Sequence, residues 1–413
     1  MNHDNDTMRR AMRLMQAGDL QAATRTLQDA LAGNAGPAPA APAAHDARGD
    51  VAGRGACLEG EFRVIDDTKA HDARPPADHH ATADPRRGPT APQPYTWPRS
   101  TAGEGATHAG VTPLRRPAPG AGTGDGNFPR LRFSCAAGEL EYGLYIPPRL
   151  ETAGAPLLVM LHGCTQTPED FARGTRMNQL ADGHGYVVAW PAQSAERNQN
   201  RCWNWFRRSD QQREQGEPAM LAALTRHLVS THRLDAGRVY VAGLSAGGAM
   251  AAVLASTHPE VYAAIGVHSG LPVGVARDMP SAFAAMRKGS GRRRRAAAGA
   301  AAPVPAIVFH GDGDATVHPG NGLGVVEQSL DHGADDAGTT RAVERASVPG
   351  GRSATRTVHR TADGRIAAEH WVVHGAGHAW SGGDASGGYT DPQGPDASAE
   401  MLRFFAGCRR SGS

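Results

Sequence analysis

The sequence predicts an α/β fold in which a mostly parallel sheet is covered by helices on both faces. Between Phe128 and Cys408, short apolar runs typical of buried strands alternate with segments of helical spacing. A Gly-Leu-Ser-Ala-Gly pentapeptide at 243–247 stands between one such run and one such segment. Residues 33–127 carry no apolar period. We therefore expect one large α/β domain at 128–408, preceded by a short helix and a long disordered region.

Two N-terminal segments precede this domain. Residues 1–32 are predicted to form an amphipathic helix, because apolar residues recur there at roughly helical spacing between polar ones. The basic start and continuous apolar stretch of a secretory signal are missing, so we expect none. Residues 33–127 are rich in Ala, Pro and Gly and cannot bury enough apolar surface to offset chain entropy. They are predicted to be a disordered linker.

The elements of the domain are predicted in chain order. Short apolar runs predict strands at 140–146, 156–161, 186–190, 238–242, 263–267 and 306–309. Helical spacing predicts helices at 169–184, 218–232, 246–257 and 401–406. The runs at 355–360 and 366–373 flank an Ala-Asp-Gly turn and are predicted to pair as a hairpin. A basic low-complexity insert with four consecutive arginines is expected at about 286–305 as a solvated surface loop.

Charge and cysteine usage exclude several classes of protein. The 43 Lys and Arg nearly balance the 41 Asp and Glu, which argues against a mainly electrostatic nucleic-acid binder. The five cysteines show no CxxC spacing, so a structural zinc site is not expected. The chain is also too long and too poor in cysteine for a small disulfide scaffold. No run approaches the ~20 apolar residues of a transmembrane helix. We expect no metal, no cofactor and no transmembrane segment.

Ser245 is the predicted nucleophile. It is the central residue of the pentapeptide at 243–247, and a sharp strand-to-helix turn there would expose its hydroxyl above the sheet. The flanking glycines allow the tight backbone. Attack on an acyl group creates an oxyanion that needs N–H donors. We expect these donors at Ala246 and at Cys164, which follows an early strand, with His162 holding that loop by hydrogen bonds.

Two similar motifs supply candidates for the base and the acid. His-Gly-Asp-Gly-Asp at 310–314 and His-Gly-Ala-Gly-His at 374–378 each follow a predicted strand. The order Ser, Asp, His along the chain is that of the α/β-hydrolase fold. His378 is the predicted base, which takes the Ser245 proton and returns it to the leaving group.

Two residues are candidates for the acid that orients the base. Asp312 and Asp314 compete for the role, because both lie in the loop after the strand at 306–309. Three other histidines are alternative bases, although hydrogen bonding in a turn or in the core is the more ordinary role for each: His310, His318 and His374.

Six motifs together resemble the poly(3-hydroxybutyrate) depolymerase-like esterases, a family that includes feruloyl and acetylxylan esterases. They are LHGCTQTPEDFA at 161–172, WPAQ at 190–193, NRCWNWF at 200–206, GLSAGGAM at 243–250, HGDGDATVHPGNG at 310–322 and GAGHAWSGG at 375–383. The resemblance covers about 130–408. It implies an α/β-hydrolase fold with Ser245 as nucleophile, Asp314 as acid and His378 as base. It also implies a candidate disulfide between Cys164 and Cys202.

Aromatic residues beside the predicted site loops are candidates for substrate binding. Trp203, Trp205 and Trp380 make up half of the six tryptophans of the chain. Exposed indole faces at these positions would bind an apolar polyester chain, a sugar or a phenolic group.

The function expected from these residues is that of a cofactor-free serine esterase. It would hydrolyse poly(3-hydroxybutyrate)-type polyesters or their oligomers through an acyl-enzyme intermediate. A feruloyl or acetylxylan-type carbohydrate esterase is the alternative enzyme. A granule-binding protein with a vestigial hydrolase fold is the alternative from another class. The missing secretion signal favours a cytoplasmic protein associated with polyhydroxyalkanoate granules, whereas the resemblance allows an extracellular one.

Overall fold

The computed structural model describes residues 110–113, 128–289, 303–331, 339–348 and 350–410. All of them belong to the second of the two units into which the chain divides, Pro89–Ser413. The predicted helix at 1–32, the predicted linker apart from 110–113, and the run of four arginines at 292–295 lie outside the described residues.

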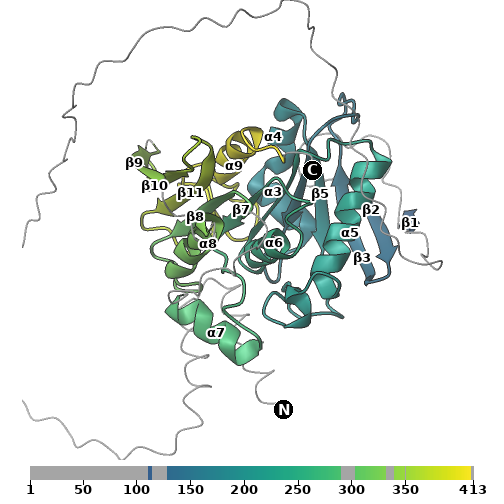
Figure 1. Ribbon diagram of the computed structural model, residues 1–413, viewed down its shortest axis with the longest axis horizontal. Helices are drawn as coiled ribbons and strands as arrows, with labels where there is room; N and C mark the ends of the chain where they lie inside the picture. The colour runs from purple at the N-terminus through teal and green to yellow at the C-terminus, as the bar shows by residue number, and fades with distance from the viewer. Residues whose placement is uncertain (1–109, 114–127, 290–302, 332–338, 349, 411–413) are drawn as a thin grey trace, which may run out of the picture. The chain divides into compact units, whose positions relative to one another are not determined.

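Eleven described strands form one sheet (Figure 1). They are β1 (Gly110–Pro113), β2 (Arg130–Cys135), β3 (Gly138–Tyr145), β4 (Leu157–Leu161), β5 (Val187–Ala192), β6 (Val239–Leu244), β7 (Ala264–His268), β8 (Ala306–Gly311), β9 (Thr340–Ser347), β10 (Ser353–Arg360) and β11 (Ile366–Val373). Their spatial order is β1-β2-β3-β5-β4-β6-β7-β8-β11-β10-β9. The strands from β5 to β11 in this order are parallel, and antiparallel strands flank them on both sides. The predicted mostly parallel sheet and the predicted hairpin are confirmed.

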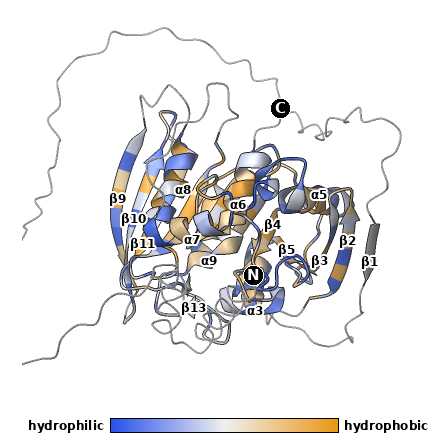
Figure 2. Cartoon of the chain, turned by 90° about the horizontal axis from the view of Figure 1, so that it is seen from below, coloured by the Kyte–Doolittle hydropathy of each residue, from blue (hydrophilic) through white to orange (hydrophobic). Residues whose placement is uncertain are grey.

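Helices cover both faces of this sheet, as predicted. They are α3 (Pro168–Thr175), α4 (Met177–His184), α5 (Gly216–Thr231), α6 (Ala246–Thr257), α7 (Met279–Lys288), α8 (Gly320–Leu330) and α9 (Ala397–Ala406), with a short 3₁₀ turn, η1, at Ser209–Gln211. Helices α5 to α8 contribute to one hydrophobic cluster, whereas α3, α4 and α9 contribute to the other. Figure 2 shows the hydrophobic residues of α6 and β4 at the centre of the domain.

The central strands appear in the sequence as continuous apolar runs because both of their faces are buried. In β4, Leu157, Val159 and Leu161 belong to the cluster of α5 to α8. The intervening Leu158 and Met160 belong to the cluster of α3, α4 and α9. Successive side chains of a strand point to opposite faces, so a strand between two helix layers needs apolar residues at every position.

One predicted helix is in fact two helices. The prediction of a single helix at 169–184 is wrong, because α3 ends at Thr175 and Arg176 adopts a left-handed conformation with φ of 54° before α4 begins. The Arg176 guanidinium donates to the carbonyl of Gly382 at 2.8 Å and to Asp396 at 2.7 Å. These partners are more than 200 residues away along the chain, so helical spacing alone does not reveal the break.

Several elements were not predicted. Strand β1 lies inside the linker predicted at 33–127, and its backbone pairs with β2, so the prediction of disorder is wrong at these four residues. Strand β9 is almost wholly exposed and therefore lacks an apolar face that would signal a strand. Strand β2 and helices α7 and α8 were also missed, and α7 includes the start of the insert predicted at about 286–305.

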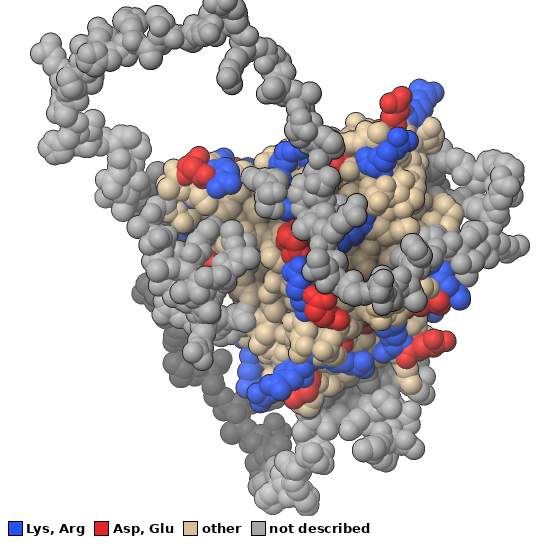
Figure 3. All heavy atoms as spheres, turned by 45° about the vertical axis from the view of Figure 1, so that its right-hand side comes forward, with Lys and Arg blue, Asp and Glu red and all other residues tan. Residues whose placement is uncertain are grey.

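The charged residues show no concentration of one sign on the face drawn in Figure 3, where Lys and Arg lie interspersed with Asp and Glu. This distribution fits the formal net charge of +2. Among the described helices, none combines the length and the apolar character needed to cross a bilayer.

Candidate active site

The candidate site lies where the chain changes direction across the sheet. Strand β5 lies on one side of β4 and β6 lies on the other, so the carboxyl ends of β4 and β6 form a topological switch point. The loop that contains Cys164 follows β4, and Ser245 follows β6 directly. Asp314 follows β8, the second strand beyond β6. The topology thus brings these predicted residues to one end of the sheet.

Ser245 forms the sharp turn between β6 and α6. Its φ of 57° and ψ of −117° lie outside the usual regions for a residue with a side chain. Its N–H donates to the carbonyl of His268 at 2.8 Å, and its own carbonyl accepts the N–H of Ala249 at 2.9 Å. The side chain is half-buried. Strained backbone of this kind is kept where the surrounding structure holds it, and it is frequent at functional sites.

The two glycines of the pentapeptide are required by close packing. A Cβ atom on Gly243 would lie 2.4 Å from the carbonyl carbon of Gly247. A Cβ atom on Gly247 would lie 2.0 Å from the carbonyl oxygen of Leu161, the last residue of β4. Any side chain at either position would therefore push α6 away from the strands and displace Ser245.

Asp314 and His378 form the buried acid and base pair. His378 Nδ1 lies 2.7 Å from Asp314 Oδ2, and the Asp314 side chain is fully buried. Asp314 Oδ1 accepts the N–H groups of Thr316 at 2.9 Å and Val317 at 2.8 Å. Burial alone would raise the pKa of Asp314, but the charge of His378 and the hydrogen bonds from His310 and His378 hold it well below its usual range. The carboxylate is therefore anionic and orients the imidazole.

The competing candidates pair with each other at the surface. His374 Nδ1 lies 2.8 Å from Asp312 Oδ2, and both side chains are more than two-fifths exposed. His310 is buried, and its Nε2 lies 2.8 Å from the carbonyl of Val317. His318 is exposed and accepts the N–H of Gly320. Burial thus separates the Asp314–His378 pair from Asp312, His374 and His318. His310 is buried as well, but its Nε2 lies between the carbonyl of Val317 and Asp314 Oδ2, at 2.8 Å and 3.4 Å.

Two buried neutral histidines hold the loops around Ser245. His162, at the end of β4, accepts the N–H of Gln193 at Nε2, so its Nδ1 donates to the carbonyl of Gly163 at 2.8 Å. His268, at the end of β7, accepts the N–H of Ser381 at Nε2. Burial lowers the pKa of His162 to about 4 and that of His268 to about 3. The predicted structural role of His162 is confirmed.

Some backbone donors in the loop after β4 are occupied and, within the described residues, the N–H of Cys164 is not. The N–H of Gly163 donates to Gln166 Oε1, and the N–H of Thr165 donates to the carbonyl of Asn200. In the part of the chain that the structure describes, the N–H of Cys164 has no acceptor. Ala246 is the first residue of α6, so its N–H has no acceptor within the helix. These two groups are the donors that the sequence predicts for an oxyanion.

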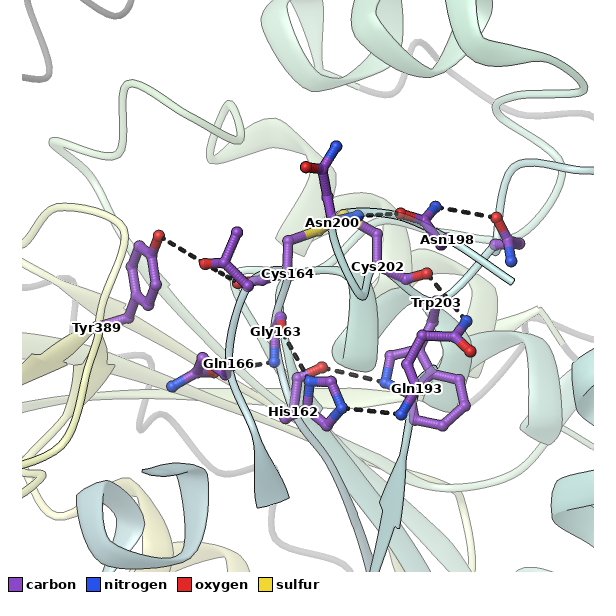
Figure 4. Close-up of a disulfide and its surroundings, with 12 residues drawn as sticks. His162, Gly163, Cys164, Gln166, Gln193, Asn198, Asn200, Cys202, Trp203 and Tyr389 are labelled. Carbon is purple, nitrogen blue, oxygen red and sulfur yellow. Dashed lines mark hydrogen bonds between the residues drawn. A yellow bond between two sulfur atoms is a disulfide. The ribbon is translucent and has the colours of Figure 1, made fainter. Parts of the chain in front are cut away.

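The implied disulfide between Cys164 and Cys202 is present (Figure 4). It joins the loop after β4 to a segment that carries a buried polar network. In that network, Glu217 accepts hydrogen bonds from the side chain of Gln193 and from the backbone N–H of Asn204. Burial raises the pKa of Glu217 to about 7. The sequence motifs contain Gln193 and Asn204, but they do not indicate that Glu217 binds both.

The predicted exposure of the tryptophans is wrong. Trp203, Trp205 and Trp380 are 2%, 6% and 0% exposed, so they offer no open indole face to a substrate. Trp203 Nε1 donates to the carbonyl of His162 at 3.1 Å, and Trp380 Nε1 donates to Ser398 Oγ at 3.0 Å. Both rings thus support the site loops from within the core. Proximity in sequence to a site loop does not show to which side a ring points.

The fold and the site geometry define the chain as an α/β protein of the α/β-hydrolase class, with a serine at the strand-to-helix turn and a buried Asp–His pair. The chain belongs to the family described as Esterase PHB depolymerase, whose model matches residues 140–348, slightly more than half of the chain.

Among curated proteins, the chain is 34% identical over 256 residues to poly(3-hydroxyalkanoate) depolymerase C of Paucimonas lemoignei, covering 60% of each chain. It is also 34% identical over 128 residues to feruloyl esterase B of Neurospora crassa, covering 31% of this chain and 42% of that protein. The chain thus spans less than two thirds of the length of these relatives. A solved acetyl xylan esterase from Aspergillus awamori aligns at 18% identity with a TM-score of 0.48, over 65% of this chain and 94% of that one.

Proposed function

We propose that the protein is a serine esterase that cleaves carboxylic esters through an acyl-enzyme intermediate, with Ser245, His378 and Asp314 as its catalytic residues. The observation that carries the proposal is the buried Asp314 carboxylate bound to Nδ1 of His378 at 2.7 Å. This bond leaves Nε2 of His378 as the basic nitrogen. The strained turn at Ser245 is the second support.

The proposed mechanism follows from these roles. His378 Nε2 removes the proton of Ser245 Oγ as that oxygen attacks the ester carbonyl carbon. The N–H groups of Cys164 and Ala246 stabilise the negative charge that develops on the carbonyl oxygen. His378 then protonates the departing alcohol, leaving an acyl group on Ser245. Water attacks this acyl group with the same base, which releases the acid and regenerates the serine. Asp314 stabilises the imidazolium in both steps.

The proposed substrates are poly(3-hydroxybutyrate)-type polyesters or their oligomers. Support comes from the family description and from two similar proteins with depolymerase names, of Paucimonas lemoignei at 34% identity and Ralstonia pickettii at 30% identity. A feruloyl or acetylxylan ester is the second candidate. It is supported by the feruloyl esterase B of Neurospora crassa and by the probable acetylxylan esterase A of Aspergillus fumigatus, at 34% and 32% identity.

The test compares wild type with Ser245→Ala on four substrates: amorphous poly(3-hydroxybutyrate) granules, a soluble 3-hydroxybutyrate oligomer, methyl ferulate and acetylated xylan. Loss of the nucleophile should lower kcat by roughly 10³ or more on every substrate that is cleaved. Ser230→Ala, an exposed serine at the end of α5, is the matched control and should retain wild-type activity. Ordinary activity in Ser245→Ala would remove the nucleophile assignment. The preferred substrate decides between the two candidate classes.

The proposed setting is the surface of a polyhydroxyalkanoate granule inside the cell. The support is the amphipathic pattern predicted at 1–32, and the rival setting is extracellular polymer. A variant without residues 1–109 keeps β1 and every other described element. Reduced association of this variant with granules in the cell would support the setting. Unchanged association would show that residues 1–109 do not attach the protein to granules. Detection of the full chain outside the cell would favour the extracellular setting.

A further inference from the structure

Tyr389 joins the two loops on which the proposed mechanism depends. Its backbone carbonyl accepts the N–H of Trp380 at 2.7 Å, two residues after His378. Its side-chain hydroxyl lies 3.1 Å from Thr165 Oγ1, the residue after Cys164 (Figure 4). One residue therefore touches the loop of the base with its backbone and the loop of the oxyanion donor with its side chain.

The direction of the hydrogen bonds at this contact can be assigned. Thr165 Oγ1 lies 2.6 Å from the carbonyl oxygen of Cys164, which can only accept, so the threonine hydroxyl donates its single proton there. Thr165 must then accept from Tyr389, whose hydroxyl is the donor. The result is a chain of two bonds from Tyr389 through Thr165 to the carbonyl of Cys164. This chain of bonds holds the peptide group between Cys164 and Thr165, which directly follows the proposed N–H donor of Cys164.

Both partners of this contact have strained backbones. Thr165 has φ of 66° and Tyr389 has φ of 55°. Such values are uncommon for residues other than glycine, and they are outliers for a β-branched or a bulky aromatic residue. Strain of this kind persists where surrounding contacts over-determine it, and it clusters at functional sites. Tyr389 reaches both loops in this unfavourable conformation.

A second side chain supports the same junction. Gln166 is 3% exposed, and its Nε2 donates to the carbonyl of Gly388 at 2.9 Å, next to Tyr389. Its Oε1 accepts the N–H of Gly163 at 2.9 Å. Gln166 thus accepts the N–H of Gly163, the residue before Cys164. Thr165 donates to the carbonyl of Cys164 itself. The N–H of Cys164 remains available between these two fixed points.

We propose that Tyr389 is a positioning residue of the esterase: it holds the loop at 163–166 in register with the loop at 375–381. The N–H of Cys164 then faces the substrate carbonyl while His378 acts as the base for Ser245. This inference rests on the proposed function. It does not place Tyr389 in contact with the reacting atoms.

The primary test is Tyr389→Phe, which removes the hydroxyl and keeps the ring. We expect kcat to fall about tenfold with KM changed less than about twofold, because a displaced oxyanion donor weakens the transition state more than the bound ester. The affinity for a phenylboronic acid, which forms a tetrahedral adduct on a serine oxygen, should weaken by the same factor as kcat/KM. The substrate is any ester that the wild type hydrolyses.

Matched variants separate this role from a merely structural one. Thr165→Val should reproduce the effect of Tyr389→Phe, and the double variant should lose little more, because both changes break one chain of bonds. Thr165→Ser keeps the hydroxyl and should retain wild-type kcat. Tyr145→Phe is the control for loss of a tyrosine hydroxyl, since Tyr145 binds Asp182 on α4. Thermal unfolding of each variant shows whether it is folded.

The outcomes are distinct. Wild-type kcat and boronic acid affinity in Tyr389→Phe, with Ser245→Ala inactive, would overturn the positioning role and leave the proposed function intact. A raised KM with unchanged kcat would overturn it in favour of a substrate contact. Independent, additive losses in the two single variants would also overturn it, because the hydroxyls would then not act as one chain. Activity in Ser245→Ala would remove the proposed function itself.

Discussion

Trp380 stacks on His268, with ring centroids 5.1 Å apart and an interplanar angle of 27°. His268 in turn accepts the N–H of Ser381 at 3.0 Å and offers its carbonyl to the N–H of Ser245. The tryptophan predicted to face the substrate therefore packs on the histidine that links the loop of His378 to the turn of Ser245. Its contribution should be to stability and loop position.

Trp380→Ala should destabilise the domain strongly. The side chain is fully buried, and truncation of a buried Trp or Phe to Ala typically costs about 3–5 kcal/mol of unfolding free energy. Urea unfolding would measure the loss. Trp380→Phe, which loses the bond to Ser398 but keeps an aromatic ring, should lose less. Wild-type stability together with a raised KM in Trp380→Ala would instead restore the role in substrate binding.

Stability should increase with pH between about 4.5 and 6.5. Burial lowers the pKa of His162 to about 4 and of His268 to about 3, so in this range both stay neutral in the folded chain and become protonated on unfolding. The pKa of Glu217 is raised to about 7, so this group acts in the opposite direction. The lowered pKa values of His258 and His370, both about 4, act in the same direction as the first pair.

The expected slope follows from the protons bound. His162 and His268 make the unfolded chain bind two more protons, and Glu217 offsets one of them. A net excess of one proton corresponds to about 1.4 kcal/mol of unfolding free energy per pH unit, and His258 and His370 add to it. Denaturant unfolding at several pH values would measure the slope. A flat or descending profile across this range would contradict the burial of neutral histidines.

Asp314→Asn and Asp312→Asn should differ sharply in activity. In the Ser-His-Asp template, the same change in the buried aspartate favours the wrong imidazole tautomer and lowers kcat about 10⁴-fold. We expect a loss of that order for Asp314→Asn. We expect a loss below about tenfold for Asp312→Asn, whose carboxylate binds His374 at the surface. Steady-state kinetics of both variants decides the assignment, and equal losses would contradict it.

Removal of the disulfide should weaken both stability and activity. Cys164 and Cys202 are 38 residues apart, and a loop of that size gives about 4 kcal/mol by the chain-entropy estimate. The double variant Cys164→Ala/Cys202→Ala should unfold at a lower temperature and have a reduced kcat, because the loop of the proposed donor is less constrained. Reductant should have the same effect on the wild type and none on the double variant. Unchanged kcat in the reduced wild type would show that the loop keeps its form without the bond.

Much of the fold could be predicted because its signals are local. The apolar run of β4 records burial on both faces, and the pentapeptide around Ser245 predicts a strand, a sharp turn and the helix observed at Ala246–Thr257. The nucleophile and base candidates could likewise be selected from short motifs. These features depend on residues that are neighbours in the chain.

Features set by distant partners could not be predicted. The residue types alone do not separate Asp312 from Asp314, which lie two positions apart, and it is the family motif that implies Asp314. In the folded chain burial separates them, because one side chain is 43% exposed and the other is fully buried. Arg176 breaks a helix to reach Gly382 and Asp396, and nothing in its own segment indicates this. The buried ring of Trp380 packs on Phe171 and His268, both more than 100 residues earlier in the chain. Each outcome depends on contacts that only the folded chain makes.

The contact between Thr165 and Tyr389 spans 224 residues of sequence. During synthesis, the loop of Cys164 and the nucleophile Ser245 would therefore leave the ribosome long before the loop of the base His378. Tyr389, which joins the loop of Cys164 to the loop of His378, would also emerge late. On the proposed mechanism, the nascent chain cannot hydrolyse an ester until the segments that contain Asp314, His378 and Tyr389 have been synthesised and have folded onto the rest of the domain. Hydrolysis of a simple chromogenic ester would then report completion of folding, a property that could be used to follow refolding or to select variants with faster maturation.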